Sequence, residues 1–258
     1  MHLKELLGIL LLCTALRARA QDNYEIQVYD SKLVPTACTM VELHSNYTFN
    51  GFKDTIHGVL PTNHALHETI EITRGICPWL EIGFYQFLTR NDDMKPDYVG
   101  NHIRPRIAVP EKYKLPVGLS LSTEFGYQDP KYCADSWTLE IRPIIDKTIG
   151  KFYIGINPVV DYSFQGENAG KPVVFSPNAK VSVAVCRKLQ IGFEYYNTMG
   201  PFGNFDQLNQ QPHQLALAFD FDLAPEWELN IGYVKGLTSA VESDIFKVIL
   251  GRRFGKVK

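Results

Sequence analysis

The feature that most constrains this chain is a two-residue alternation that recurs in segments of about ten residues. In residues 213–223, every second position from Leu215 to Leu223 is leucine or phenylalanine, and the positions between them are alanine or aspartate. Because successive side chains of a strand point to opposite faces, such a segment has one apolar and one polar or small face. Residues 117–127 and 151–164 show the same pattern. The chain is therefore predicted to be all-β.

Twelve such segments can be distinguished, and the connections between them alternate between short and long. The segments are 40–49, 65–75, 78–88, 100–109, 117–127, 135–145, 151–164, 173–185, 188–197, 213–223, 226–235 and 244–254. Five short connections and six long, polar ones place both ends of the strand array on the short-turn side. Outer-membrane barrels have an even strand number, short periplasmic turns and long external loops. The prediction is an antiparallel up-and-down transmembrane β-barrel of about 12 strands.

Four prolines fall inside these predicted strands, at Pro105, Pro143, Pro158 and Pro177. Each lacks the N–H group that a strand donates to its neighbour. They either mark local irregularities on the apolar face or end the strands there. The strand count depends on which of these holds.

The first twenty residues are predicted to be a signal peptide that is cleaved after Ala20. Lys4 gives a positive start, residues 6–16 are mostly apolar, and the run 18–20 has the small residues that precede a cleavage site. The mature chain is then the barrel at 21–258, with 21–39 as a periplasmic N-terminal segment. Beyond the signal peptide, no apolar stretch approaches the roughly 20 residues of a membrane helix.

The mature chain retains four cysteines: Cys38, Cys77, Cys133 and Cys186. No pair has the spacing of zinc ligands. Cys38 begins the first predicted strand and Cys77 lies in the turn after the second, so both are expected at the periplasmic rim. A Cys38–Cys77 disulfide is the favoured pairing, while free thiols remain compatible with the sequence. Cys133 and Cys186 are expected at opposite ends of the barrel and should not pair with each other.

Charged residues gather on the face that alternation assigns to the barrel interior. This is expected, because an arginine or lysine facing lipid at mid-bilayer costs about 2–4 kcal/mol. Two interpretations stay open: a plugged lumen held by ion pairs, and a water-filled pore whose charges select solutes. The candidate lumen-lining residues are Glu42, His44, Arg104, Arg106, Glu124, Glu140, Arg142, Asp161, Lys180 and Glu194.

The sequence gives little support for an enzyme, a cofactor, a metal site or a nucleic-acid partner. The 26 basic and 28 acidic residues nearly balance, which argues against nucleic acid as a partner. The run His44-Ser45-Asn46 resembles part of a lipase site, but Ser45 lies on the opposite strand face from its neighbours. His57, His64 and His67 could bind a metal, yet solvated loop histidines are the expected state. No Gly-rich phosphate loop or catalytic carboxylate pair is present.

Several runs resemble a known family. They are residues 137–158 (WTLEIRPIIDKTIGKFYIGINP), 175–182 (FSPNAKVS), 25–30 (EIQVYD), 41–47 (VELHSNY) and 250–254 (LGRRF). Together they are similar to uncharacterised bacterial outer-membrane β-barrels, described as transporters or porin-like and related to the barrels grouped with meta-pathway phenol degradation. The resemblance implies an outer-membrane location, contact with outer-membrane lipid, and recognition by the barrel assembly machinery. It supplies no substrate and no catalytic residue.

The sequence departs from that family in two places. Cys77 and Cys186 stand at turns that usually carry Asp, Thr or Lys, and residues 255–258 extend beyond the aromatic Phe254, where an assembly signal normally ends.

The predicted function is a passive channel or transporter for small molecules in the bacterial outer membrane. The alternative is a non-conducting barrel with a structural or ligand-binding role through its external loops. An exported soluble β-protein is a third possibility.

Overall fold

The computed structural model describes residues 23–91 and 95–255. The predicted signal peptide, its cleavage site and residues 256–258 lie outside the described residues. The strands are β1 (Thr39–Asn50), β2 (Leu66–Cys77), β3 (Leu80–Arg90), β4 (Asp97–Ala108), β5 (Gly118–Gln128), β6 (Asp135–Ile149), β7 (Phe152–Gly166), β8 (Val174–Cys186), β9 (Leu189–Asn197), β10 (Gly200–Pro201), β11 (His213–Ala224), β12 (Trp227–Gly236) and β13 (Asp244–Phe254). A single turn of 3-10 helix, Glu111–Tyr113, interrupts the connection between β4 and β5.

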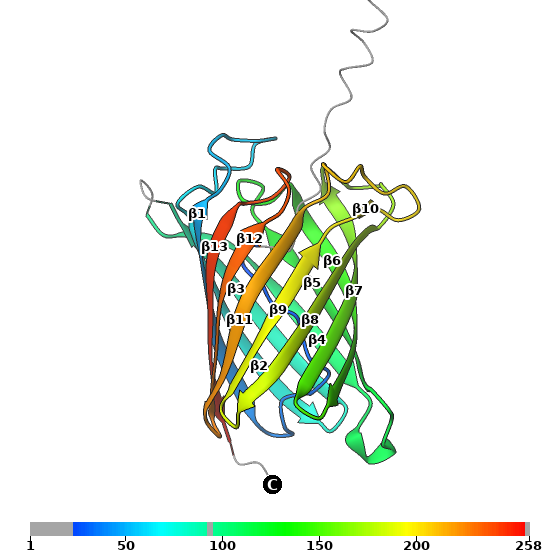
Figure 1. Cartoon of the computed structure of the whole chain (residues 1–258). Helices are drawn as coiled ribbons and strands as arrows, with labels where there is room; N and C mark the ends of the chain where they lie inside the picture. The colour runs from blue at the N-terminus through cyan, green and yellow to red at the C-terminus, as the bar shows by residue number, and fades with distance from the viewer. Residues whose placement is uncertain (1–22, 92–94, 256–258) are drawn as a thin grey trace, which may run out of the picture.

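The strands form a closed antiparallel barrel (Figure 1). Each long strand pairs with the next one along the chain, and β1 pairs with β13, from Thr39 opposite Phe254 to Asn50 opposite Asp244. The short strand β10 adds two residues to the edge of β8 near the loops, while β8 itself pairs with β9. The twelve-stranded up-and-down barrel predicted from the alternation is confirmed. No helix among the described residues is long and apolar enough to cross a membrane.

The four prolines are accommodated inside strands and do not end them. Pro105 lies opposite Ile82 of β3, and on its other side the β4–β5 pairing passes from Ile103 directly to Arg106. Pro158 of β7 stands opposite Pro177 of β8. A missing N–H removes a ladder bond on one side only, so the opposite neighbour still holds the strand.

The two barrel ends differ in their connections. The turn end carries the short connections and the first residues of β1, and the loop end carries the long connections (Figure 1). Apolar side chains such as Ile72, Phe84, Ile103 and Phe193 are exposed on the outer face. The polar side chains between them point inward and are buried, which is the alternation expected of a membrane barrel.

The N-terminal part of the described chain differs from its sequence-based expectation. Residues 23–38, here called the inner segment, enter at the loop end and pass through the barrel to the start of β1, where Figure 1 shows them in dark blue behind the front strands. Tyr24, Ile26 and Val28 are almost fully buried. The sequence-based expectation was a periplasmic segment over 21–39. Residues 23–38 instead lie inside the barrel, where wall side chains supply the hydrogen-bond partners that water would supply outside.

The favoured disulfide is not formed. All four cysteines among the described residues are free thiols. The register places Cys38 opposite Gly75, whose N–H donates to the Cys38 carbonyl oxygen at 3.0 Å. Cys77 lies two residues farther along, beyond a register shift at the turn. The two cysteines share the turn end, as expected, but are not a directly opposed pair.

Candidate functional site: the occupied lumen

Wall side chains satisfy the backbone of the inner segment along its length. Near the loop end, the Asn46 amide donates to the Asn23 carbonyl oxygen at 2.8 Å, and the Thr69 hydroxyl donates to the Tyr24 carbonyl oxygen at 2.6 Å. Farther in, the Lys247 amine donates to the Ile26 carbonyl oxygen at 3.0 Å. Buried backbone groups need such partners, and an extended segment has none of its own. The lumen is therefore built to receive this stretch of chain.

Apolar contacts hold the same segment in the middle of the barrel. Ile26 and Val28 pack with inward-facing Ala216, Val234 and Ile245. Burying a side chain of this size contributes about 1.5–3 kcal/mol. Inward apolar residues would be unfavourable in an open aqueous pore. Here the apolar side chains of the inner segment cover them and exclude water.

Tyr29 is the centre of the polar contacts. Three guanidinium groups lie over its ring, those of Arg142 at 4.6 Å, Arg104 at 5.3 Å and Arg106 at 5.7 Å from the ring centroid. Its hydroxyl is 3.0 Å from that of Tyr85 on β3. A cation over an aromatic face is worth about 0.5–2 kcal/mol, more when water is excluded. The three arginines thus bind the inner segment through one aromatic ring.

Arg104 and Arg106 of β4 are paired with carboxylates. Arg104 contacts Glu71 and lies 3.0 Å from Glu81, and Arg106 Nε lies 2.8 Å from the same Glu81 oxygen. Gly83 leaves room for this cluster, since a Cβ atom there would lie 3.2 Å from Arg104 Nη2. Neutralised in this way, the two arginines do not form the open basic patch that a selective pore would need.

The same cluster fastens the turn-end part of the inner segment. Arg106 donates to the carbonyl oxygens of Asp30 and Lys32, and Glu81 accepts the Val34 N–H at 2.6 Å. Ion pairs of the wall therefore extend into hydrogen bonds with the segment. A charge change at Arg104 or Arg106 would therefore disturb the ion pairs of the wall and the hydrogen bonds to the inner segment together.

A second buried cluster lies on β8, β9, β11 and β13. Lys180 Nζ is 2.9 Å from Glu194 and 2.8 Å from Asp220, and Lys247 contacts Glu194 on its other side. Lys247 also reaches the inner segment, as described above. One carboxylate thus bridges two amines in the lumen wall.

The remaining predicted lumen residues are placed inside the barrel as well. Arg142 Nε is 2.6 Å from its β6 neighbour Glu140, His102 Nδ1 is 2.5 Å from Glu124, and Asp161 accepts a hydrogen bond from a β8 serine. Of the ten candidates, Glu42 and His44 stand apart from these pairs.

Sequence reasoning missed the inner segment, its most contacted residue Tyr29, and the wall residue Asn157 that binds Tyr29. The run EIQVYD alternates apolar and polar residues just as a strand does, and Ile26 and Val28 lie on one side of it. That short alternation was the available signal. It gave no indication of whether the run would lie inside or outside the barrel.

Above the inner segment, the loop end of the lumen holds a cavity of about 250 Å³. Tyr24 and Glu25 form part of its floor. One lysine, Lys171, and eight carboxylates are among the described residues that line it. The carboxylates are Glu25, Glu124, Asp135, Glu140, Asp161, Glu167, Asp206 and Glu242. The cavity is therefore acidic and suited to a cationic or neutral polar solute.

Two loop residues of this cavity have altered acidity. Burial and the adjacent Asp97 carboxylate, which accepts a hydrogen bond from the Tyr132 hydroxyl at 2.7 Å, raise the pKa of Tyr132. Burial also raises the pKa of Asp206. The tyrosine hydroxyl therefore stays protonated and remains a hydrogen-bond donor at neutral pH.

A second hollow, of about 390 Å³, lies at the turn end. Met40, Trp227, Glu228 and Arg253 are among its lining residues. The inner segment contacts β3, β4 and β6 at this end through Glu81, Arg106 and Asp146, so the hollow lies on the opposite side of the lumen. Packed chain therefore separates the two open spaces.

Comparison with known proteins finds similarity in structure alone. No family model and no curated protein matches the sequence. Among solved structures, the COG4313 outer membrane channel from Pseudomonas putida F1 superposes with a TM-score of 0.57 at 10% identity, covering 89% of this chain and 100% of that one. The KdgM porin superposes with a TM-score of 0.55 at 6% identity, covering 84% and 99%. This chain has the fold of an outer-membrane β-barrel. At these identities the likeness establishes the barrel fold and leaves the solute open.

Proposed function

We propose that this protein is an outer-membrane channel for small polar solutes that is held closed by its own inner segment. Its apolar outer face contacts outer-membrane lipid, its loop end faces the exterior and its turn end the periplasm, after delivery by the barrel assembly machinery. The observation that carries the proposal is the inner segment itself, which fills a lumen of paired charges between two separate hollows. No catalytic step and no nucleic-acid partner form part of this function.

Opening requires the segment to shift, because buried side chains occupy the middle of the lumen. Ile26 is 1% exposed and the wall residues Ala216, Val234 and Ile245 are 0% exposed. A solute entering from outside would first meet the acidic cavity, which concentrates cations and repels anions. We therefore assign a preference for cationic or neutral polar solutes.

The alternative function is a non-conducting barrel that binds a ligand at its loop end. The specific observation in its favour is the closed floor of the cavity, where Tyr24 and Glu25 stand between a bound solute and the turn end. Under this alternative the segment never moves, and the cavity is a binding pocket. A conductance measurement distinguishes the plugged channel from the non-conducting binding barrel.

The test compares planar-bilayer currents of the wild-type protein with those of a variant in which residues 23–36 are replaced by a Gly/Ser run of equal length. The replacement keeps the chain length and removes the Ile26, Val28 and Tyr29 contacts. A plugged channel predicts small, infrequent openings for wild type and large, steady currents for the variant. Absence of current from both correctly inserted proteins contradicts the channel and supports the binding alternative.

A further inference from the structure

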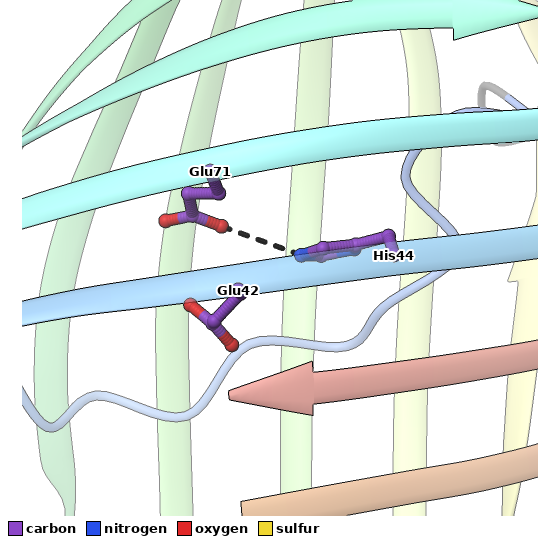
Figure 2. Close-up of side chains that lie close together, drawn as sticks. All are labelled: Glu42, His44 and Glu71. Carbon is purple, nitrogen blue, oxygen red and sulfur yellow. Dashed lines mark ion pairs between the residues drawn. The ribbon is translucent and has the colours of Figure 1, made fainter. Parts of the chain in front are cut away.

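Within the part of the chain that the structure describes, one group of inward-facing residues makes no direct hydrogen bond or ion pair with the inner segment: Glu42, His44 and Glu71. Glu42 and His44 lie two residues apart on β1, and Glu71 lies opposite Glu42 on β2. Figure 2 shows Glu42 and His44 on β1 and Glu71 on the neighbouring β2, with the His44 imidazole directed at the Glu71 carboxylate. One nitrogen and two carboxylate oxygens, one from each residue, lie within 4.8 Å of one another. This is the donor arrangement of a three-ligand metal site.

His44 is buried, and its one polar contact among the described residues is a long one, to Glu71. It is 0% exposed, and neither ring nitrogen has a hydrogen-bond partner among the described residues. Its Nε2 points toward Glu71 Oε2 at 3.5 Å, and that oxygen is itself buried without a hydrogen-bond partner in the same part of the chain. A buried polar group without a partner costs about 1–3 kcal/mol. An ion between these two atoms would satisfy both.

The surrounding charges also favour a cation. Glu42 and Glu71 are directly opposed on adjacent strands, where like charges destabilise a sheet. Arg104 is held between Glu71 Oε1 and Glu81, which leaves Glu71 Oε2 free to face His44. No ion pair or hydrogen bond joins Glu42 to any described side chain.

A third carboxylate lies close to the pair. Gly251 of β13 stands opposite Glu42, and a Cβ atom there would lie 3.0 Å from the Glu228 carboxylate. Glu228 and Met40 line the turn-end hollow. The hollow therefore exposes Glu228 and Met40, the two side chains that lie beside Gly251 and hence next to the half-buried Glu42.

We propose that Glu42, His44 and Glu71 form a binding site for a divalent transition-metal ion of the zinc class. An imidazole nitrogen with two carboxylate oxygens suits zinc, whereas calcium and magnesium take six or more oxygen ligands. Zinc–ligand distances of about 2.1 Å bring tetrahedral donors about 3.4 Å apart, so modest side-chain rotations close the site. A water molecule from the hollow completes the coordination.

The site would strengthen the wall beside the inner segment. A metal on Glu71 Oε2 fixes the carboxylate that also holds Arg104, and Arg104 lies over Tyr29. This inference does not depend on the channel function, since a closed barrel would hold the ion equally well. The competing explanation is a proton shared by Glu42 and Glu71, which predicts no metal affinity.

The experiment measures Zn²⁺ binding by the full protein in detergent, after EDTA treatment and its removal, using isothermal titration. We expect one high-affinity ion per chain. Loss of a residue that only hydrogen-bonds a metal ligand typically weakens metal binding 10–100-fold. The variants His44→Gln and Glu42→Gln remove ligands themselves, so each should weaken Zn²⁺ binding at least tenfold. His102→Gln, which removes a buried histidine outside the site, is the matched control and should keep wild-type affinity.

X-ray absorption on the zinc-loaded wild-type protein tests the ligands without any substitution, in case a variant fails to insert. One nitrogen and otherwise oxygen neighbours near 2.0–2.2 Å are expected for this donor set. Sulfur neighbours would assign the ion to the cysteines and overturn the proposal. Failure of the wild type to bind, or unchanged affinity in an inserted His44→Gln variant, would overturn it as well.

Discussion

Asn157 on β7 and Tyr29 of the inner segment exchange two hydrogen bonds. The Tyr29 N–H donates to Asn157 Oδ1 at 2.8 Å, and the Asn157 amide donates to the Tyr29 carbonyl oxygen at 3.0 Å. The side-chain amide thus replaces the partner strand that this stretch of backbone lacks. Because Asn157 is 0% exposed, water does not compete for either bond. The segment is fixed at its most contacted residue.

Replacing Asn157 with alanine should loosen the inner segment while the barrel persists. Both Tyr29 backbone groups lose their partner, and each buried unsatisfied group costs about 1–3 kcal/mol. Counting one such group alone, we expect hydrogen exchange at the Tyr29 amide to accelerate by at least about 5- to 150-fold. Asn230→Ala is the control, because Asn230 donates to Asp220 and not to the segment. Equal exchange in both variants would show that Asn157 does not hold the segment.

Lys247→Met should destabilise the barrel strongly. It removes an amine that is 0% exposed and leaves Glu194 with Lys180 alone, and breaking a buried ion pair typically costs about 3–5 kcal/mol. The measurement is the urea midpoint of unfolding in lipid vesicles. Lys235→Met removes an amine that is mostly exposed, although its partner Asp244 is buried, and should lower the midpoint much less. A Lys247→Met midpoint equal to that of wild type would refute the bridging role.

The cysteines should react in the order of their exposure. Cys186 is exposed and Cys38 is fully buried. Alkylation of the folded protein should therefore label Cys186 first and Cys38 only after unfolding, and mass analysis should count four thiols in the mature chain. A mass lower by two protons, with Cys38 and Cys77 both unreactive, would establish the disulfide that the structure lacks.

Neutralising the loop-end cavity should weaken its preference for cations. In the Gly/Ser-replaced channel, Asp161→Asn removes a carboxylate from the cavity wall, and we expect the reversal potential in a salt gradient to move toward that of an unselective pore. Asp54→Asn changes an exposed loop carboxylate that does not line the cavity and serves as control. An identical shift in both variants would indicate a general surface-charge effect.

The barrel was predictable because its information is local. Strands such as β11 carry the two-residue alternation within themselves, and the even count with alternating connections then determines the topology. The position of residues 23–38 could not be predicted in this way. The six alternating residues 25–30 are equally compatible with a segment in the lumen, an edge strand or a linker. The alternation showed that the four prolines face outward. It could not show that the strands continue through them, because that depends on hydrogen bonds to the neighbouring strand.

The arrangement of the lumen charges depended on register. Alternation placed Arg104, Arg106 and Glu124 on the inner face, but it could not show that Arg104 reaches Glu71 two strands away or that Tyr29 lies between the arginines. The cluster of Glu42, His44 and Glu71 was missed for the same reason, because the opposition of Glu42 and Glu71 exists only in the paired sheet. Reversing Arg104 and Arg106 to glutamate would not report on ion selectivity, because it would break the buried pairs with Glu71 and Glu81 and hence disturb folding.

The central claim is that the inner segment closes the lumen and must move for current to flow. The most direct measurement is the single-channel current of an Ile26→Cys, Ile245→Cys variant, with the native cysteines changed to serine, before and after reduction of the engineered disulfide. These two residues pack in one buried cluster. A closed segment predicts no openings while the disulfide is intact and wild-type openings after reduction. Equal currents in both states would contradict the account.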